Sequence, residues 1–173
     1  MKKNNDVSYE IYRFGFNYLG RRLTFLDADI KGFNVYRIYD GEWINDWPAG
    51  IKFIFKGNSK DNFLEGGLHW ILLSENVRII FNQDQIEDVQ FLPVQAVHKK
   101  TGFTLGTYWA INVIRAVPDL KWQYVHDLDI FRLSTMLFFS GRLKRKIESA
   151  KVTSGATFSL IPPAYLDIEG FAK

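Results

Sequence analysis

The side chains that most often carry out chemistry in proteins are sparse in this chain. It contains three histidines, His69, His98 and His126, and no cysteine. No two histidines have the i, i+4 spacing of a helical metal site, so a metal ion would require them to converge in the fold. Around His126, strand alternation places the imidazole on one face and Asp127 and Asp129 on the other, which disfavours a His–carboxylate chelate. We therefore predict no metal ligands.

Carboxylate pairs and serines offer a second kind of chemistry. Asp27 and Asp29 are two positions apart, and such a pair supports acid–base catalysis only where its surroundings separate the two pKa values. Ser74 and Ser140 each follow an apolar run, but neither lies in a Gly-x-Ser-x-Gly nucleophile elbow. Both suit the N-cap of a helix, where the hydroxyl accepts from free backbone N–H groups. No phosphate-binding glycine loop is present, and we predict no catalytic residue and no cofactor.

Two segments are better suited to binding than to catalysis because they are rich in aromatic residues. Trp43, Asp46 and Trp47 precede a proline in a turn-rich loop, and Trp122 and Tyr124 form a second such segment. Tryptophan and tyrosine are favoured anchors of protein interfaces. We predict these five residues as the candidate partner interface; the alternative is that their rings fold back onto the core.

A basic stretch, Arg142–Lys146, could contact phosphate groups or an acidic partner. It alternates with Leu143 and Ile147 as an ordinary amphipathic helix does, and it lacks the interleaved aromatic residues that bind single-stranded nucleic acid. The net charge of the chain is only +3. These features argue against a nucleic-acid partner.

The elements that must position these residues include a pattern that occurs twice. Residues 68–73 and 136–139 are strand-like runs that end at Ser74 and Ser140, which are 66 positions apart. In each copy the spacing of apolar residues then predicts a short amphipathic helix, and another apolar run follows. Internal duplication and coincidence are both open as explanations.

The remaining patterns predict a fold that is mostly β. Strand-like runs cover 8–16, 33–39, 51–56, 106–116 and 129–133. We predict an α+β fold with antiparallel or mixed sheets and two short helices. The length of 173 residues predicts a single domain over 1–173. Its possible half-units are an N-terminal β region, 1–66, and a region that carries the doubled unit, 67–173.

The sequence also gives an expectation for the compartment. No run approaches the roughly 20 apolar residues that a membrane span needs, and no signal peptide precedes the first predicted strand. The absence of cysteine fits a reducing environment. We expect a cytoplasmic protein with no membrane partner.

The central and C-terminal segments resemble a family of bacterial polymorphic-toxin immunity proteins, the immunity protein 11 type. The similar segments are residues 68–94, with the runs Leu-Leu-Ser-Glu-Asn-Val and Val-Gln-Phe-Leu-Pro-Val, and residues 108–114, 129–133 and 139–144. The chain departs from the family pattern at 153–158, where a Thr-Gly-aromatic ending is expected. The first 60 residues match no part of the pattern.

The resemblance implies a non-catalytic immunity protein that binds and neutralises a cognate toxin domain in competition between bacteria. It transfers no catalytic residue to this chain. The alternative is a small enzyme or ligand-binding domain with a pocket between the two repeat halves. The positive net charge argues against a strongly cationic toxin as partner, because complementary potentials favour an acidic antidote there.

Overall fold

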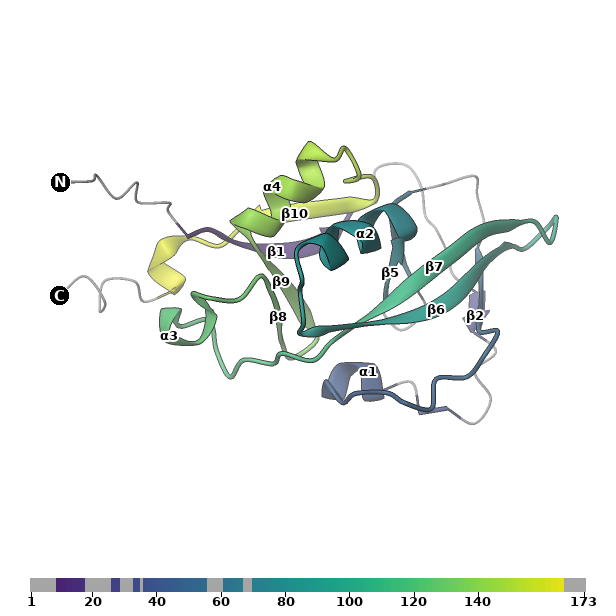
Figure 1. Cartoon of the computed structure of the whole chain (residues 1–173), viewed down its shortest axis with the longest axis horizontal. Helices are drawn as coiled ribbons and strands as arrows, with labels where there is room; N and C mark the ends of the chain where they lie inside the picture. Colours follow the sequence, from purple (N-terminus) through teal and green to yellow (C-terminus); the bar gives the residue numbers. More distant parts are fainter. Residues whose placement is uncertain are drawn as a thin grey trace.

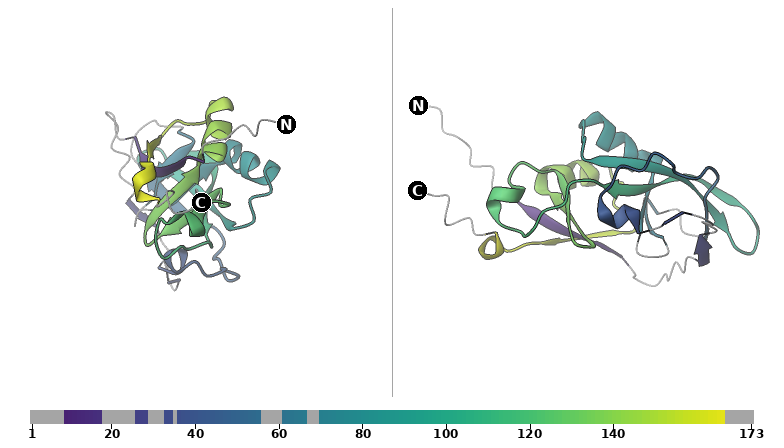
Figure 2. Two further views of the ribbon diagram at one scale, coloured as in Figure 1. Left: turned by 90° about the vertical axis from the view of Figure 1, so that its left-hand side faces the viewer. Right: turned by 90° about the horizontal axis from the view of Figure 1, so that it is seen from below.

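The computed structural model describes residues 9–17, 26–28, 33–34, 36–55, 61–66 and 70–166, with the backbone alone for 26–28. These residues form two β-sheets with short helices (Figures 1 and 2). The prediction of a mostly β, α+β fold with mixed and antiparallel sheets is confirmed. None of the helices in these ranges is long and apolar enough to cross a membrane.

The larger sheet has six strands in the order β2-β3-β6-β7-β5-β4. Its strands are β2 (Leu26–Ala28), β3 (Lys52–Phe55), β4 (Phe63–Glu65), β5 (Ile71–Ser74), β6 (Val89–His98) and β7 (Thr104–Val113). β3 pairs with β6 in parallel, and the other neighbours are antiparallel. The sheet is therefore mixed. The hairpin of β6 and β7 extends beyond the rest of the molecule (Figure 1).

The smaller sheet has four antiparallel strands in the order β10-β1-β9-β8. Its strands are β1 (Ile11–Phe16), β8 (Ile130–Leu133), β9 (Met136–Ser140) and β10 (Ala156–Leu160). The helices are α1 (Arg37–Asp40), α2 (Glu75–Gln83), α3 (Trp122–Val125) and α4 (Gly141–Ser149), with a 3₁₀ turn at Pro163–Tyr165. The strands of residues 1–66 are divided between both sheets, since β1 lies inside the smaller sheet and β2 to β4 lie in the larger one.

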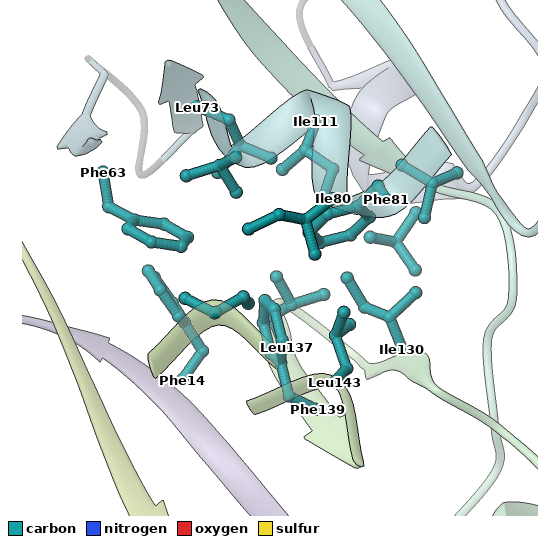
Figure 3. Close-up of a cluster of buried hydrophobic side chains, with 14 of the residues drawn as sticks. Phe14, Phe63, Leu73, Ile80, Phe81, Ile111, Ile130, Leu137, Phe139 and Leu143 are labelled. Carbon is teal, nitrogen blue, oxygen red and sulfur yellow. The ribbon is translucent and has the colours of Figure 1, made fainter. Parts of the chain in front are cut away.

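One buried apolar cluster joins the two sheets. Phe14, Leu137 and Phe139 from the smaller sheet face Phe63 and Leu73 from the larger one (Figure 3). Helices α2 and α4 lie side by side over the cluster and add further buried side chains, namely Val77, Ile80, Phe81, Leu143 and Ile147. Burying one such side chain contributes roughly 1.5–3 kcal/mol, so this cluster is a large part of what holds the sheets together.

The doubled sequence pattern corresponds to a repeated arrangement of elements. In one copy β5 leads through α2 to β6, and β7 lies between the two strands, antiparallel to both. In the other copy β9 leads through α4 to β10, and β1 takes the position of β7. The outer strands β4 and β8 pair with β5 and β9 in the same way. The strand in the middle of each unit therefore has a different origin: β7 follows β6 in the chain, whereas β1 comes from the N-terminal part.

Equivalent residues of the two copies also make equivalent contacts. The Ser74 amide donates to Asn62 O and the Ser140 amide to Asp129 O, both at 2.8 Å. Arg78 lies over the Trp109 ring, and Lys144 lies over the Tyr12 ring, at matching places in the two units. Gene duplication stays a prediction for the origin of this repetition.

The predicted strand at 33–39 is wrong, since none of its described residues lies in a strand. Arg37–Asp40 forms α1, and Gly41 ends it in the left-handed conformation, with φ of 71°, where glycine carries no steric penalty. Arg132 Nη1 donates to Tyr39 O at the end of this helix. Tertiary contacts and a glycine cap therefore override the β propensity of the aromatic and branched residues. Val35 lies outside the described residues.

The two predicted N-caps differ. Ser140 Oγ accepts from Leu143 N at 3.1 Å, as predicted, and it also donates to Asp129 Oδ1 at 2.7 Å. Ser74 precedes α2, but its hydroxyl makes no capping bond; it donates to Asn62 Oδ1 at 2.6 Å instead. The prediction of a hydroxyl cap at Ser74 is wrong, because the preceding loop offers the hydroxyl a side-chain acceptor.

We expect Ser140→Ala to destabilise the protein more than Ser74→Ala does. Ser140 is buried, and its loss leaves Leu143 N and Asp129 each short of a partner, at a cost of about 1–3 kcal/mol. Ser74 is half-buried and loses one neutral hydrogen bond, which contributes about 0.5–1.5 kcal/mol. Urea denaturation of the two variants beside the parent protein measures both values. An equal or larger loss for Ser74→Ala would contradict the assignment of the cap.

Candidate functional site

Residues 36–47 form a continuous surface made of α1 and the loop that follows it. We call it the 36–47 surface. It carries two strongly exposed aromatic side chains, Tyr36 with 61% and Trp43 with 55% of its area accessible. Loops with exposed aromatic rings are usually mobile, so their value for recognition depends on how the backbone is held.

Two polar side chains of the larger sheet hold the backbone of this loop. Gln90 Oε1 accepts from Ile44 N at 2.9 Å, and Gln90 Nε2 donates to Ile44 O at 2.6 Å, so one amide pairs with both backbone groups of Ile44. Asn112, which is fully buried, donates from Nδ2 to Glu42 O at 2.7 Å. It also donates to Gln90 Oε1 at 3.1 Å. The loop is therefore fixed to β6 and β7 at two successive points.

Trp47 provides a third attachment. Its indole Nε1 donates to Pro93 O at 2.9 Å, and its ring packs on Trp70 with centroids 5.6 Å apart. Pro93 lies in the part of β6 that precedes the pairing with β3, which begins at Gln95. The indole thus covers a strand edge that would otherwise expose its carbonyl groups. The Trp47 ring therefore folds back onto the core, which is the alternative given above for the five candidate interface residues.

Asp46 anchors the charged side of the surface. Both of its carboxylate oxygens accept from Arg37 Nη1, at 2.7 and 2.9 Å, and Glu42 lies 3.6 Å from Arg37 Nε. The hydrogen bond from Arg37 lowers the pKa of Asp46. Asp46 therefore stays ionised, and the three charges connect the helix to the loop.

The second pair of predicted interface residues lies elsewhere. Trp122 and Tyr124 belong to α3, which Figure 1 shows at the end of the molecule opposite the tip of the β6–β7 hairpin. Trp122 packs edge-on against Tyr9, with centroids 5.0 Å apart, whereas Tyr124 is exposed. The structure brings Trp43, Asp46 and Trp47 together in one loop and leaves Trp122 and Tyr124 apart from them.

The two histidines that the structure describes, His98 and His126, lie in different parts of the molecule. His98 Nδ1 lies 2.9 Å from Thr101 Oγ1 in the β6–β7 turn, whereas His126 pairs with Asp127 at 2.8 Å beside α3. Among the residues that the structure describes, no group of three or more His, Asp or Glu side chains could hold a metal ion. His69 and the side chains of Asp27 and Asp29 lie outside the described residues.

The cations of α4 are engaged in ion pairs within the protein. Arg142 Nε donates to Asp129 at 2.9 Å, and Arg142 and Lys146 both pair with Asp84, whose side chain is almost fully buried. Arg145 pairs with Glu10 at 2.8 Å. These carboxylates neutralise the basic stretch locally, which weakens its attraction for phosphate groups.

A groove of about 790 Å³ lies between the two sheets, beside α1. Its apolar walls include Phe14, Ile71 and Leu137. A smaller cavity of about 40 Å³ adjoins the groove. Tyr39 lines both spaces, and Trp70 lines the smaller cavity. Tyr39 Oη and Trp70 Nε1 are buried and have no hydrogen-bond partner in the described part of the chain. Burial raises the pKa of Tyr39 to about 12, so the hydroxyl keeps its proton at neutral pH.

Sequence reasoning missed Gln90, Asn112 and Arg132, which position the 36–47 surface. A signal was present for the first two, because each is a polar amide within an apolar strand run, and they are directly opposite each other in the β6–β7 register. Their partner, the backbone of residues 42–44, is distant in sequence and carries no motif. The hydrogen bonds from these two amides to the loop could therefore not be predicted from the sequence alone.

No protein-family model matches the chain, and no curated protein matches it either. The resemblance to immunity proteins is consequently a prediction that rests on the sequence segments quoted above.

We expect Gln90→Ala to release the loop while leaving the sheet intact. Ile44 N loses its acceptor, so the hydrogen-exchange rate of the Ile44 amide should rise at least about tenfold, which corresponds to about 1.4 kcal/mol of lost local protection. Gln95→Ala, an exposed position on the same strand, is the matched control. Hydrogen exchange followed by NMR measures both; unchanged exchange at Ile44 in Gln90→Ala would refute the role of this side chain.

Proposed function

We propose that this protein is an immunity protein that binds a cognate toxin domain and neutralises it by occlusion, without catalysis. The observation that carries the proposal is the 36–47 surface, in which Trp43 and Tyr36 are exposed on a backbone fixed by Gln90 and Asn112. A fixed loop loses little conformational entropy when a partner binds, so more of the contact energy appears as affinity.

The sequence resemblance supplies the second support. The similar segments include β5 with α2, β6, β7, β8 and the start of α4, which are the elements of the scaffold, whereas the 36–47 surface belongs to the unmatched N-terminal part. A shared scaffold with a variable binding surface is what a set of antidotes to different toxins requires. Within this proposal the partner is a protein and the expected compartment is the cytoplasm, where a delivered toxin would act.

The proposal predicts a toxin-domain gene next to the gene of this protein, and the test is a binding experiment with the product of that neighbouring gene. The purified pair should co-elute from a sizing column as a one-to-one complex, and the toxin activity should fall to background at equimolar antidote. Ser74→Ala should bind as the parent protein does, because Ser74 lies in the scaffold. Separate elution of the two parent proteins would overturn the proposal.

A second candidate function is favoured by the groove between the sheets. Its volume lies in the range of about 300–1,000 Å³ typical of small-molecule sites. Tyr39 lines both the groove and the adjoining small cavity, and Trp70 lines the small cavity alone. Tyr39 Oη and Trp70 Nε1, which have no hydrogen-bond partner in the described part of the chain, suit a ligand that carries a hydrogen-bonding oxygen. This candidate corresponds to a ligand-binding domain with its pocket between the repeat halves. It requires no catalytic group.

The anionic fluorophore 8-anilinonaphthalene-1-sulfonate is a suitable probe of the groove. If the groove is a binding site, the probe fluorescence should saturate at one equivalent, and Thr135→Trp, at the exposed rim, should reduce the rise by narrowing the groove. Thr104→Trp places the same residue on the exposed β6–β7 hairpin and should have no effect. Equal fluorescence in both variants, or none in the parent protein, would exclude this candidate.

A further inference from the structure

The 36–47 surface differs in charge from the protein as a whole. The chain has a net charge of +3, whereas this segment contains one cation, Arg37, and three carboxylates, on Asp40, Glu42 and Asp46. Arg132 reaches the end of α1 from β8 and adds a second cation beside Asp40, so the carboxylates still outnumber the cations. A docking partner experiences the local potential more strongly than the net charge, because solvent and salt screen charges that lie beyond about 10 Å. The sign of the local charge therefore decides which partner face is attracted.

The arrangement of the charges strengthens the negative potential toward solvent. The Glu42 and Asp46 side chains are 63% and 68% exposed, whereas the Arg37 side chain between them is only 25% exposed. The cation thus lies beneath the carboxylates and orients them, and the outward face is acidic. Each Asp46 oxygen accepts one bond from Arg37 and has a further lone pair for a donor from outside. Glu42 makes only the longer contact with Arg37, at 3.6 Å.

The exposed rings add a second preference for cations. An aromatic face attracts a guanidinium or ammonium group placed over it, and tryptophan does so most strongly. Trp43 directly follows Glu42, and Tyr36 directly precedes Arg37, so each ring neighbours a member of the charged group. The protein itself stacks cations on aromatic rings elsewhere: the guanidinium carbon of Arg78 lies 4.4 Å from the Trp109 centroid.

From these features we infer that the 36–47 surface receives its partner through arginine or lysine side chains, which stack on Trp43 and pair with Glu42 and Asp46. This inference rests on the proposed function. It specifies that the toxin is bound through a basic face of its protein surface. It replaces the expectation drawn from net charge, which pointed away from a cationic partner. The basic stretch of α4 is not the docking site in this scheme, because its cations are already paired with Asp84, Asp129 and Glu10.

The experiment uses the full chain and the toxin domain encoded next to its gene. Binding is followed by surface plasmon resonance or stopped-flow fluorescence at low and high salt. Trp43→Ala should weaken the affinity at least about 30-fold, as expected for a central aromatic anchor. Glu42→Gln should slow association several-fold and make it less dependent on salt, because it removes a steering charge.

Two matched controls locate the effect. Glu87→Gln makes the same change of charge at an exposed position outside the surface, and Tyr124→Ala removes an exposed ring from α3. Both should bind within about twofold of the parent protein. Circular dichroism and urea denaturation of every variant identify any loss of folding.

The outcomes separate the inference from the proposed function. Lack of binding by the parent protein overturns the proposed function and this inference with it. Binding by the parent protein with equal effects of Glu42→Gln and Glu87→Gln, or with Tyr124→Ala rather than Trp43→Ala as the damaging change, overturns the inference and leaves the proposed function standing. Selective loss in Trp43→Ala and Glu42→Gln supports both.

Discussion

The structure depends on one packing constraint: two sheets of different size must bury their facing sides against each other and beneath the same pair of helices. Phe14, Phe63 and Phe139 meet in the middle of this interface, and the Phe14 ring lies within 5.5 Å of both other rings, centroid to centroid. Helices α2 and α4 close the cluster from above. Because both helices contribute to the same cluster, neither repeat unit buries its apolar face by itself, and the two are stable only as a pair.

The position of the 36–47 surface is a consequence of that pairing. Arg132 belongs to β8 of the smaller sheet, but its guanidinium reaches Tyr39 O at the end of α1 and Val113 O at the end of β7. Burial lowers the pKa of this guanidinium, although Asp40 nearby opposes the effect, and its hydrogen bonds to two carbonyl groups stabilise it there. If the two sheets moved relative to each other, α1 would lose this contact. The position of the 36–47 surface therefore depends on the core between the sheets.

Local patterns predicted what local physics determines. Apolar spacing after Ser74 and Ser140 predicted two short helices, which the structure forms over 75–83 and 141–149. Alternation predicted β1, and apolar runs predicted β3, β6 and β7 within a few residues. The errors arose where a distant contact decides the outcome. α1 exists in a segment with strand propensity because Gly41 and Arg132 end it, and the Ser74 hydroxyl turned to Asn62. Among the candidate site residues, the sequence identified the loop of Trp43 and Trp47 but not their different roles, because only the position of Pro93 makes Trp47 an attachment point.

The attachment of the 36–47 loop to β7 through Asn112 has a cost in stability. Asn112 is fully buried and its Oδ1 has no hydrogen-bond partner in the described part of the chain, and an unpaired buried acceptor costs about 1–3 kcal/mol. An apolar residue at this position of β7 would avoid that cost and fit the run of isoleucine and valine around it. What Asn112 adds is the bond to Glu42 O, which holds the loop backbone at Glu42 and Trp43. The buried amide thus lowers core stability and fixes this backbone in return, which is the compromise expected if the 36–47 surface binds a partner, as proposed.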